Sequence, residues 1–279
     1  MTTKINHKKL AIYYGWPSAV NATYTVSAAI AVFKNYNILV FGDGLQDVTH
    51  PDHANTLAII AGIPKTKVYG YIDSVLSLET LRPKIDNWKE MGVAGIFCDK
   101  FGYDFGLTRA NQNEIVDYIH SKNLSVFVNA YNPEDAFAPT SDAITHLGAK
   151  DWYLAESYQI INDEYQSVSE WKIRSEAMKK YKHAVGTSMA VITTTQSGVF
   201  DQSKFNYAFY SSLIYGFDAF GWGEQDYSAS TAQLPFRQRP KIYGTEYTSD
   251  MIEEDGIFTR QTNVGFKVNT VTRTIDYLL

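Results

Sequence analysis

Two acidic residues follow apolar, strand-like segments of the chain. Asp99 ends VAGIFCD (93–99), and Glu156 is the next-to-last residue of DWYLAES (151–157). Two carboxyl groups that face one substrate can divide the work of glycoside hydrolysis. One acts as nucleophile or base, while the other, with a raised pKa, protonates the leaving oxygen. We therefore treat Asp99 as the candidate nucleophile and Glu156 as the candidate acid/base.

Other apolar segments also end in residues of the kinds that bind sugars. A flat aromatic ring packs on the apolar face of a pyranose, and polar side chains hydrogen-bond to its hydroxyls. Ordinary core packing of the rings, and strand-end hydrogen bonding by Asn129, are the competing interpretations. The candidate substrate-binding residues are Trp16, Asp43, Asp73, Tyr103, Asn129, Tyr131, Trp222 and Glu224.

Other chemistries are less well supported by the sequence. His50 and His53 are spaced for a metal, but no third ligand is evident nearby, so no metal and no organic cofactor is expected. Ser188 lacks the tight turn of a hydrolase nucleophile. Lys100 is the candidate for an aldolase-like Schiff base, but its alternation relative to Asp99 argues against that role.

The elements that must position these residues form a repeat of strand, polar loop and amphipathic helix. We expect eight strands at 10–16, 37–43, 67–73, 93–99, 124–130, 151–157, 183–189 and 217–224. We expect seven helices at about 23–35, 52–62, 78–90, 111–122, 134–147, 168–181 and 203–214. Ser167 with Glu170, and Asn111 with Glu114, resemble capping boxes at helix starts.

Strands that alternate with helices are parallel, and eight such units favour a (β/α)8 TIM barrel over an open doubly wound sheet. The GDG at 42–44 lacks the full dinucleotide fingerprint that the open sheet would need. The active site of a barrel lies at the C-terminal ends of its strands, so Asp99 and Glu156 should meet there. Side-chain alternation then places Phe97 and Leu154 inside the barrel and turns Cys98 toward the helices.

The chain divides into a barrel at 1–228 and a strand-rich extension at 229–279. Within the extension, GIFTRQTNVGFKVNTVTRTIDYLL indicates a β-hairpin that turns at NVG. Such a hairpin would pack on the barrel or on a partner, in a homo-oligomer or a larger assembly.

Composition limits the partners and the compartment. The 279 residues carry a formal net charge of −5 and no cluster of Lys and Arg, so nucleic acid is not expected as a partner. No apolar run is long enough to span a membrane, and no secretion signal is recognised. One cysteine excludes a disulfide within the chain.

The segments VAGIFCDKFGYDFG, LSVFVNAYNP and DWYLAESYQ resemble strands of the spherulin-4-like glycoside hydrolases. These are TIM-barrel enzymes related to the endo-α-1,4-polygalactosaminidases and to the hydrolase domain that trims the Pel polysaccharide. The resemblance covers about residues 8–228. It implies catalysis by Asp99 and Glu156, substrate contact by Asn129, and an extracellular or surface location.

That resemblance implies an endo-acting enzyme for an amino-sugar, galactosamine-type polysaccharide. Lys100 departs from the pattern, because some members of the family carry a second acid there. The alternative hypothesis is a non-catalytic carbohydrate-binding or structural barrel of a surface or phage assembly.

Overall fold

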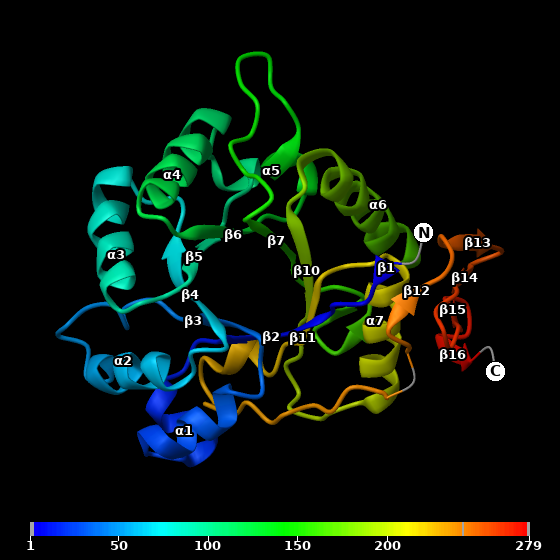
Figure 1. Cartoon of the computed structure of the whole chain (residues 1–279), viewed down its shortest axis with the longest axis horizontal. Helices are drawn as coiled ribbons and strands as arrows, with labels where there is room; N and C mark the ends of the chain where they lie inside the picture. Colours follow the sequence, from blue (N-terminus) through cyan, green and yellow to red (C-terminus); the bar gives the residue numbers. More distant parts are fainter. Residues whose placement is uncertain (1–2, 242, 278–279) are drawn as a thin grey trace.

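The computed structural model describes residues 3–241 and 243–277. In this part of the chain, eight parallel strands close into a barrel, and helices surround it (Figure 1). The strands follow the order β10-β11-β2-β3-β4-β5-β6-β7 around the barrel, so each lies beside its neighbour in sequence. The predicted (β/α)8 TIM barrel is therefore confirmed.

The bounds of most predicted elements agree with the structure. The barrel strands are β2 (Lys8–Tyr13), β3 (Ile38–Phe41), β4 (Lys67–Asp73), β5 (Gly95–Asp99), β6 (Ser125–Asn129), β7 (Trp152–Ala155), β10 (Ser188–Thr193) and β11 (Ala219–Trp222). The helices are α1 (Val26–Phe33), α2 (His53–Gly62), α3 (Leu78–Glu90), α4 (Arg109–Ser121), α5 (Pro133–Phe137), α6 (Val168–Val185) and α7 (Gln202–Ile214). Short 3-10 turns are η1 (Pro17–Ala22), η2 (Tyr103–Phe105) and η3 (Asp226–Ser228).

Apolar side chains form one cluster inside the barrel and another between the barrel and the helices. Phe97 and Leu154 belong to the inner cluster, and Cys98 belongs to the outer one. This arrangement follows from the period of two along a strand, and it confirms the predicted alternation around Asp99 and Glu156.

The seventh strand was predicted too early in the chain. Residues 183–185 extend α6, which ends at Gly186 with a φ of 83°, and β10 begins only at Ser188. Glycine ends helices in this way because it adopts the left-handed conformation without a steric penalty. Ser188 therefore lies at the N-terminal end of its strand, opposite the end where the other strands deliver their acids, which removes it as a candidate nucleophile.

The helix predicted at 134–147 is also much shorter than expected. α5 ends at Phe137, and Ala138 is already extended, with a ψ of 137°. The proline at 139 disfavours helical geometry at Ala138 and cannot donate a backbone hydrogen bond. The chain after α5 forms the loop that projects furthest in Figure 1.

The two predicted helix starts differ in outcome. The hydroxyl of Ser167 accepts a hydrogen bond from the Glu170 amide, as expected for the cap of α6. At α4 the capping residue is Thr108, and Asn111 is its partner in the first turn. The predicted Asn111–Glu114 box is therefore wrong by one turn.

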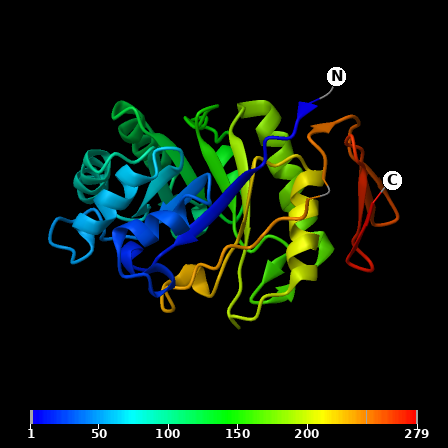
Figure 2. The ribbon, with the colours of Figure 1, turned by 60° about the horizontal axis from the view of Figure 1, so that its bottom comes forward.

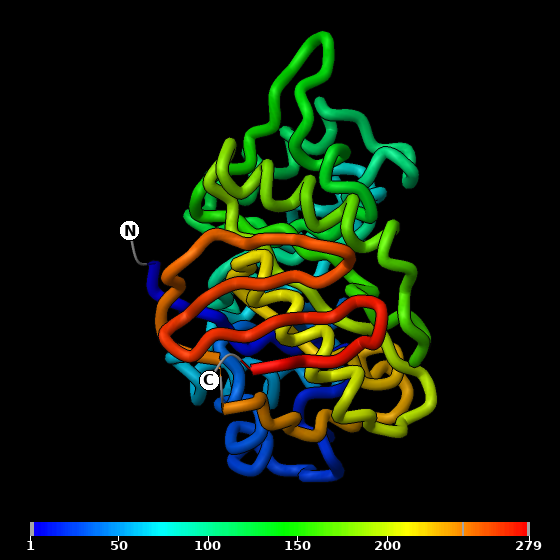
Figure 3. The backbone as a smooth tube through the Cα atoms, turned by 90° about the vertical axis from the view of Figure 1, so that its right-hand side faces the viewer, coloured from blue at the N-terminus to red at the C-terminus, as the bar shows by residue number. Residues whose placement is uncertain are grey.

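The C-terminal hairpin is one part of a larger sheet. Strands β13 (Ile252–Glu254), β14 (Ile257–Arg260), β15 (Phe266–Asn269) and β16 (Thr274–Tyr277) form an antiparallel sheet that lies beside α7 (Figures 2 and 3). Residues 263–265 fall within the β14–β15 connection, as predicted. Phe266 packs on Tyr210 of α7 with ring centroids 5.1 Å apart, and Phe258 packs on Trp171 of α6 at 5.7 Å.

The N-terminus is tied to this side of the molecule. Strand β1 (Thr3–Lys4) pairs antiparallel with β12 (Glu246–Tyr247), which precedes the C-terminal sheet. The division of the chain at residue 228 stays a prediction. None of the described helices is both long and apolar enough to cross a membrane.

Candidate active site

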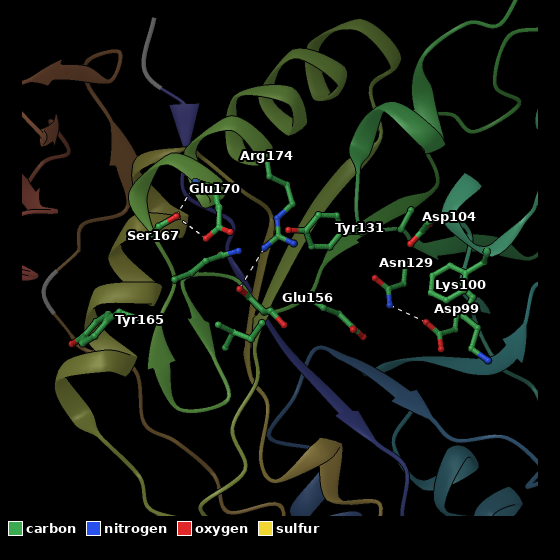
Figure 4. Close-up of a pocket in the computed structure, with 15 residues that line it drawn as sticks. Asp99, Lys100, Asp104, Asn129, Tyr131, Glu156, Tyr165, Ser167, Glu170 and Arg174 are labelled. Carbon is green, nitrogen blue, oxygen red and sulfur yellow. Dashed lines mark hydrogen bonds between the residues drawn. The ribbon is translucent and has the colours of Figure 1, made fainter.

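A pocket of about 570 Å³ opens at the C-terminal mouth of the barrel (Figure 4). It lies between the segments that follow β5, β6 and β7 and the first turns of α6. The hairpin formed by β8 (Ile160–Ile161) and β9 (Glu164–Tyr165) forms one of its walls. The lining residues are Asp99, Lys100, Asp104, Phe105, Asn129, Ala130, Tyr131, Glu156, Ser157, Ile161, Tyr165, Gln166, Ser167, Glu170 and Arg174.

Asp99 is held by hydrogen bonds to both of its carboxylate oxygens. The Tyr71 hydroxyl donates to Oδ2 at 2.8 Å, and Asn129 Nδ2 donates to Oδ1 at 2.9 Å. Tyr71 and Asn129 come from the strands on either side of β5, so the barrel itself fixes the orientation of the carboxylate. Donors on both oxygens stabilise an ionised carboxylate, which is the form a nucleophile requires.

Glu156 lies directly after β7 and shares the pocket with Asp99. Burial, followed by the negative charge of Asp99, raises the pKa of Glu156 to about 7. The polar groups of Asn129 and Tyr227, and the charge of Arg174, lower this pKa and so act in the opposite direction. A carboxyl group with this pKa is partly protonated at neutral pH and can donate its proton to a leaving oxygen.

Three tyrosines, Tyr14, Tyr71 and Tyr227, lie beside the two acids. The ring of Tyr14 lies edge-on to the rings of Tyr71 and Tyr227, with centroids 5.6 Å apart in each case. Burial, and then the negative charge of Glu156, raises the pKa of Tyr14 and of Tyr227. These phenols therefore stay neutral and can act as hydrogen-bond donors beside the acids.

Tyr227 lies in a turn with an unusual backbone conformation. Residues 225–228 all have positive φ angles, from 29° to 65°, although none of them is glycine. The Thr195 hydroxyl accepts from the Gln225 amide, and the Tyr227 carbonyl accepts from the Tyr14 amide. Left-handed backbone at a non-glycine residue costs about 1–2 kcal/mol, so the surrounding contacts must hold this turn in place.

The structure brings four of the ten predicted site residues into the pocket: Asp99, Glu156, Asn129 and Tyr131. Tyr103 lies on η2, just outside the lining, with its ring 5.7 Å from the Arg109 guanidinium. Asp43 and Asp73 lie outside the lining and are held in ion pairs, with Lys84 at 2.7 Å and with Lys100 at 2.6 Å.

Three other predictions of sugar contact are not supported. Trp222 is on the outer face of β11, where its ring packs against Phe200 and Phe205 at 5.5 and 5.7 Å. Ala219 faces the barrel interior, so alternation necessarily turns Trp222 toward α7. Glu224 is buried against Arg237.

Trp16 is exposed and lies outside the pocket lining. Its ring contacts that of His50, with centroids 5.4 Å apart. His50 and His53 each have a backbone hydrogen-bond partner, and no cluster of three or more metal-binding side chains occurs in residues 3–241 and 243–277.

Lys100 does not leave an unpaired positive charge at the site. Its ammonium group bonds to Asp73, and this contact raises the pKa of Lys100. A Schiff-base lysine needs a lowered pKa, so the pairing argues against the aldolase-like alternative.

Sequence reasoning missed two residues that line the pocket, Glu170 and Arg174, and one that lies beside the acids, Tyr227. Tyr227 lies beyond the last strand, in a turn whose conformation the sequence does not reveal. Glu170 and Arg174 lie four residues apart near the start of α6, and that spacing places them on one face of the helix. The spacing was a usable signal, because the first turns of the helix that follows a barrel strand lie near the mouth.

Comparison with solved structures finds this fold in enzymes of several kinds. The glycoside hydrolase domain of PelA from Pseudomonas aeruginosa is similar with a TM-score of 0.51 and 10% identity, over 81% of this chain and 99% of that one. The carboxyl transferase domain of Rhizobium etli pyruvate carboxylase is similar with a TM-score of 0.52 and 10% identity, over 79% of this chain and 40% of that one. Malate synthase from Haloferax volcanii is similar with a TM-score of 0.50 and 11% identity, over 85% of this chain and 76% of that one.

No protein-family model matches the chain, and no curated protein matches its sequence. At identities of 10–11% these similarities establish the barrel fold. The functional argument therefore depends on the side chains at the mouth of the barrel.

Proposed function

We propose that this protein is a glycoside hydrolase that cleaves within an amino-sugar polysaccharide of the galactosamine type. The observation that carries the proposal is the pairing of Asp99 with Glu156 in one pocket. Asp99 has a hydrogen bond on each oxygen, and the pKa of Glu156 is raised to about 7. Two carboxyl groups whose environments differ in this way have the properties of a nucleophile and an acid/base.

In the proposed reaction, Glu156 protonates the glycosidic oxygen while Asp99 attacks the anomeric carbon. Glu156, now ionised, then takes a proton from the water that releases the glycosyl group. Asn129 contacts Asp99 directly and lies in the same pocket, so it can also hold a hydroxyl of the sugar. Tyr131, an exposed ring on the pocket wall, can support the sugar face.

The charge of the pocket supports an amino sugar. Four acids line it, Asp99, Asp104, Glu156 and Glu170, against two cations, Lys100 and Arg174, and the charge of Lys100 is compensated by Asp73. A chain of cationic sugars would gain favourable electrostatic interactions on entering this pocket.

The test is product release from acetylated and deacetylated galactosamine and glucosamine polymers. We expect wild type to cleave one of them, and Asp99→Asn and Glu156→Gln to lose at least about 10³-fold in kcat/KM, since each removes a group that acts in the transition state. Cleavage that survives both substitutions would refute the assignment.

The non-catalytic alternative predicts a different result. A binding barrel would cleave none of the polymers, would bind them equally well after both substitutions, and would lose binding after Tyr131→Ala. Trp222 is not suitable for this test, because its ring faces α7.

A further inference from the structure

Arg174 is a buried cation with too few partners. Only 7% of its surface is exposed, and its guanidinium lies in the pocket wall between Glu170 and Tyr131 (Figure 4). Its one hydrogen bond to the described residues is long, from Nη2 to the Ser157 carbonyl at 3.4 Å. No ion pair joins it to a carboxylate in that part of the chain.

Arg109 shows what an equally buried structural arginine does in this protein. It is 4% exposed, and its two terminal nitrogens make four hydrogen bonds of 2.6–3.0 Å, to Gln112 and to the carbonyls of residues 135, 136 and 138. Arg174 has the same five N–H donors and makes one weak bond. Since burying a charge without partners is unfavourable, its donors are available to a ligand.

The position of Arg174 is set before any ligand arrives. Its guanidinium lies 5.4 Å from the centre of the Tyr131 ring, a contact that orients the planar group. Its stem projects from α6, one turn after Glu170. The carboxylate of Glu170 accepts a hydrogen bond from the Ser167 hydroxyl at 2.6 Å. The pocket wall thus presents a fixed donor and a fixed acceptor on one helix face.

We propose that Arg174 binds a carbonyl-type oxygen carried by a substituent of the sugar chain. This inference rests on the proposed function, because it takes the pocket to hold such a chain. An acetamido group fits both side chains, since its C=O accepts from Arg174 and its N–H donates to Glu170. A uronic acid carboxylate offers the same oxygen chemistry, but it would be repelled by Glu156 and Glu170. A free ammonium group would be repelled by Arg174 itself.

The experiment measures binding of three galacto-configured oligosaccharides by calorimetry: N-acetylated galactosamine, deacetylated galactosamine and galacturonic acid. It uses Glu156→Gln protein, so that binding is read without turnover. We expect Arg174→Gln to weaken binding of the acetylated oligomer by at least about tenfold, the size expected for a lost hydrogen bond to a charged group. Binding of the deacetylated oligomer should change less than about twofold.

Arg174→Lys keeps the charge but not the planar fork, so it should recover only part of the loss. Arg82→Gln is the matched control, because Arg82 also lies over a tyrosine ring, that of Tyr118 at 5.2 Å, but is exposed on α3. Thermal unfolding of each variant separates a binding effect from a folding defect, and Arg174→Lys carries the test if Arg174→Gln does not fold.

An Arg174-dependent preference for galacturonic acid would support the oxygen subsite and identify a carboxylate as its source. Equal losses on the acetylated and deacetylated oligomers, or no loss on either, would overturn the proposal. These results do not depend on cleavage, so an oligosaccharide that binds through Arg174 without being hydrolysed would count against the proposed reaction and leave the subsite intact.

Discussion

At the scale of single residues, the pKa of Glu156 gives the most direct prediction. The proposed acid must be protonated, and its pKa of about 7 lies far above the ordinary value of 4.5. The protonated fraction falls as the pH rises through 7, so kcat/KM should fall tenfold per pH unit above that point. A pH–rate profile measures this limb directly. Activity that stays level up to pH 9 would exclude Glu156 as the acid.

Tyr227 should affect the pH at which kcat/KM begins to fall. The Tyr227 hydroxyl lowers the pKa of Glu156, so Tyr227→Phe, which removes that hydroxyl, should raise the pKa of Glu156 and move the basic limb to higher pH. One hydrogen bond is worth about 0.5–1.5 kcal/mol, which corresponds to a shift of up to about one pH unit.

The control for this shift is Tyr158→Phe. That hydroxyl is buried in the cluster between the barrel and the helices, away from both acids. Tyr158→Phe should therefore leave the pH–rate profile unchanged. A Tyr227→Phe profile that coincides with wild type, or that moves to lower pH, would contradict the assigned contact.

At the scale of elements, the start of α6 links stability to binding. The Ser167 hydroxyl caps the helix and also donates to Glu170, which lines the pocket. Ser167→Ala should therefore lower the free energy of unfolding by about 1 kcal/mol, the usual value of such a cap, and should also raise KM. Chemical denaturation and steady-state kinetics measure the two effects.

Ser77→Ala is the matched control for the cap. Ser77 accepts from the Thr80 amide at the start of α3 and lies outside the candidate active site. It should cause a similar loss of stability with no change in KM. An equal rise in KM for both variants would mean that the effect of Ser167 is not local.

The strands also show how much of the fold the sequence patterns could predict. Short apolar runs that alternate with helical patterns predicted eight strands, and seven of them overlap the barrel strands closely, because each run is buried on both faces. The seventh failed because the helix before it continues to Gly186, and an apolar tail of a helix has the same composition as a strand.

The residues of the candidate site could also be predicted only in part from the sequence. Asp99 and Glu156 share one pocket, as predicted, because the closed barrel gathers the C-terminal strand ends at one mouth. Trp222 was misplaced, because an error of one residue in alternation moves a side chain from the interior to the helix layer. Tyr227 depends on four left-handed residues, and no local pattern in QDYS predicts that backbone.

At the scale of the whole molecule, the C-terminal sheet covers the outer faces of α6 and α7. Phe266 is fully buried against Tyr210, so Phe266→Ala should lower the free energy of unfolding by about 3–5 kcal/mol through the lost contact and the cavity left behind. Val271, which is exposed in the turn between β15 and β16, should tolerate alanine with a change below about 0.5 kcal/mol.

Both values come from thermal or denaturant unfolding. A loss below about 1 kcal/mol for Phe266→Ala would mean that the sheet is an appendage that the barrel does not need. That outcome would favour a self-sufficient unit at residues 1–228, whereas the expected loss would make the sheet part of one cooperative structure.

The thiol of Cys98 can be used to measure how often strand β5 opens. This thiol is fully buried on β5, one residue before Asp99, and burial raises its pKa, so a disulfide reagent in solution reacts with it only when the strand opens. The labelling rate therefore measures how often the strand that carries the proposed nucleophile is released from its neighbours. A bound oligosaccharide should slow labelling in proportion to its occupancy, which would yield a dissociation constant for any candidate ligand without requiring a reaction.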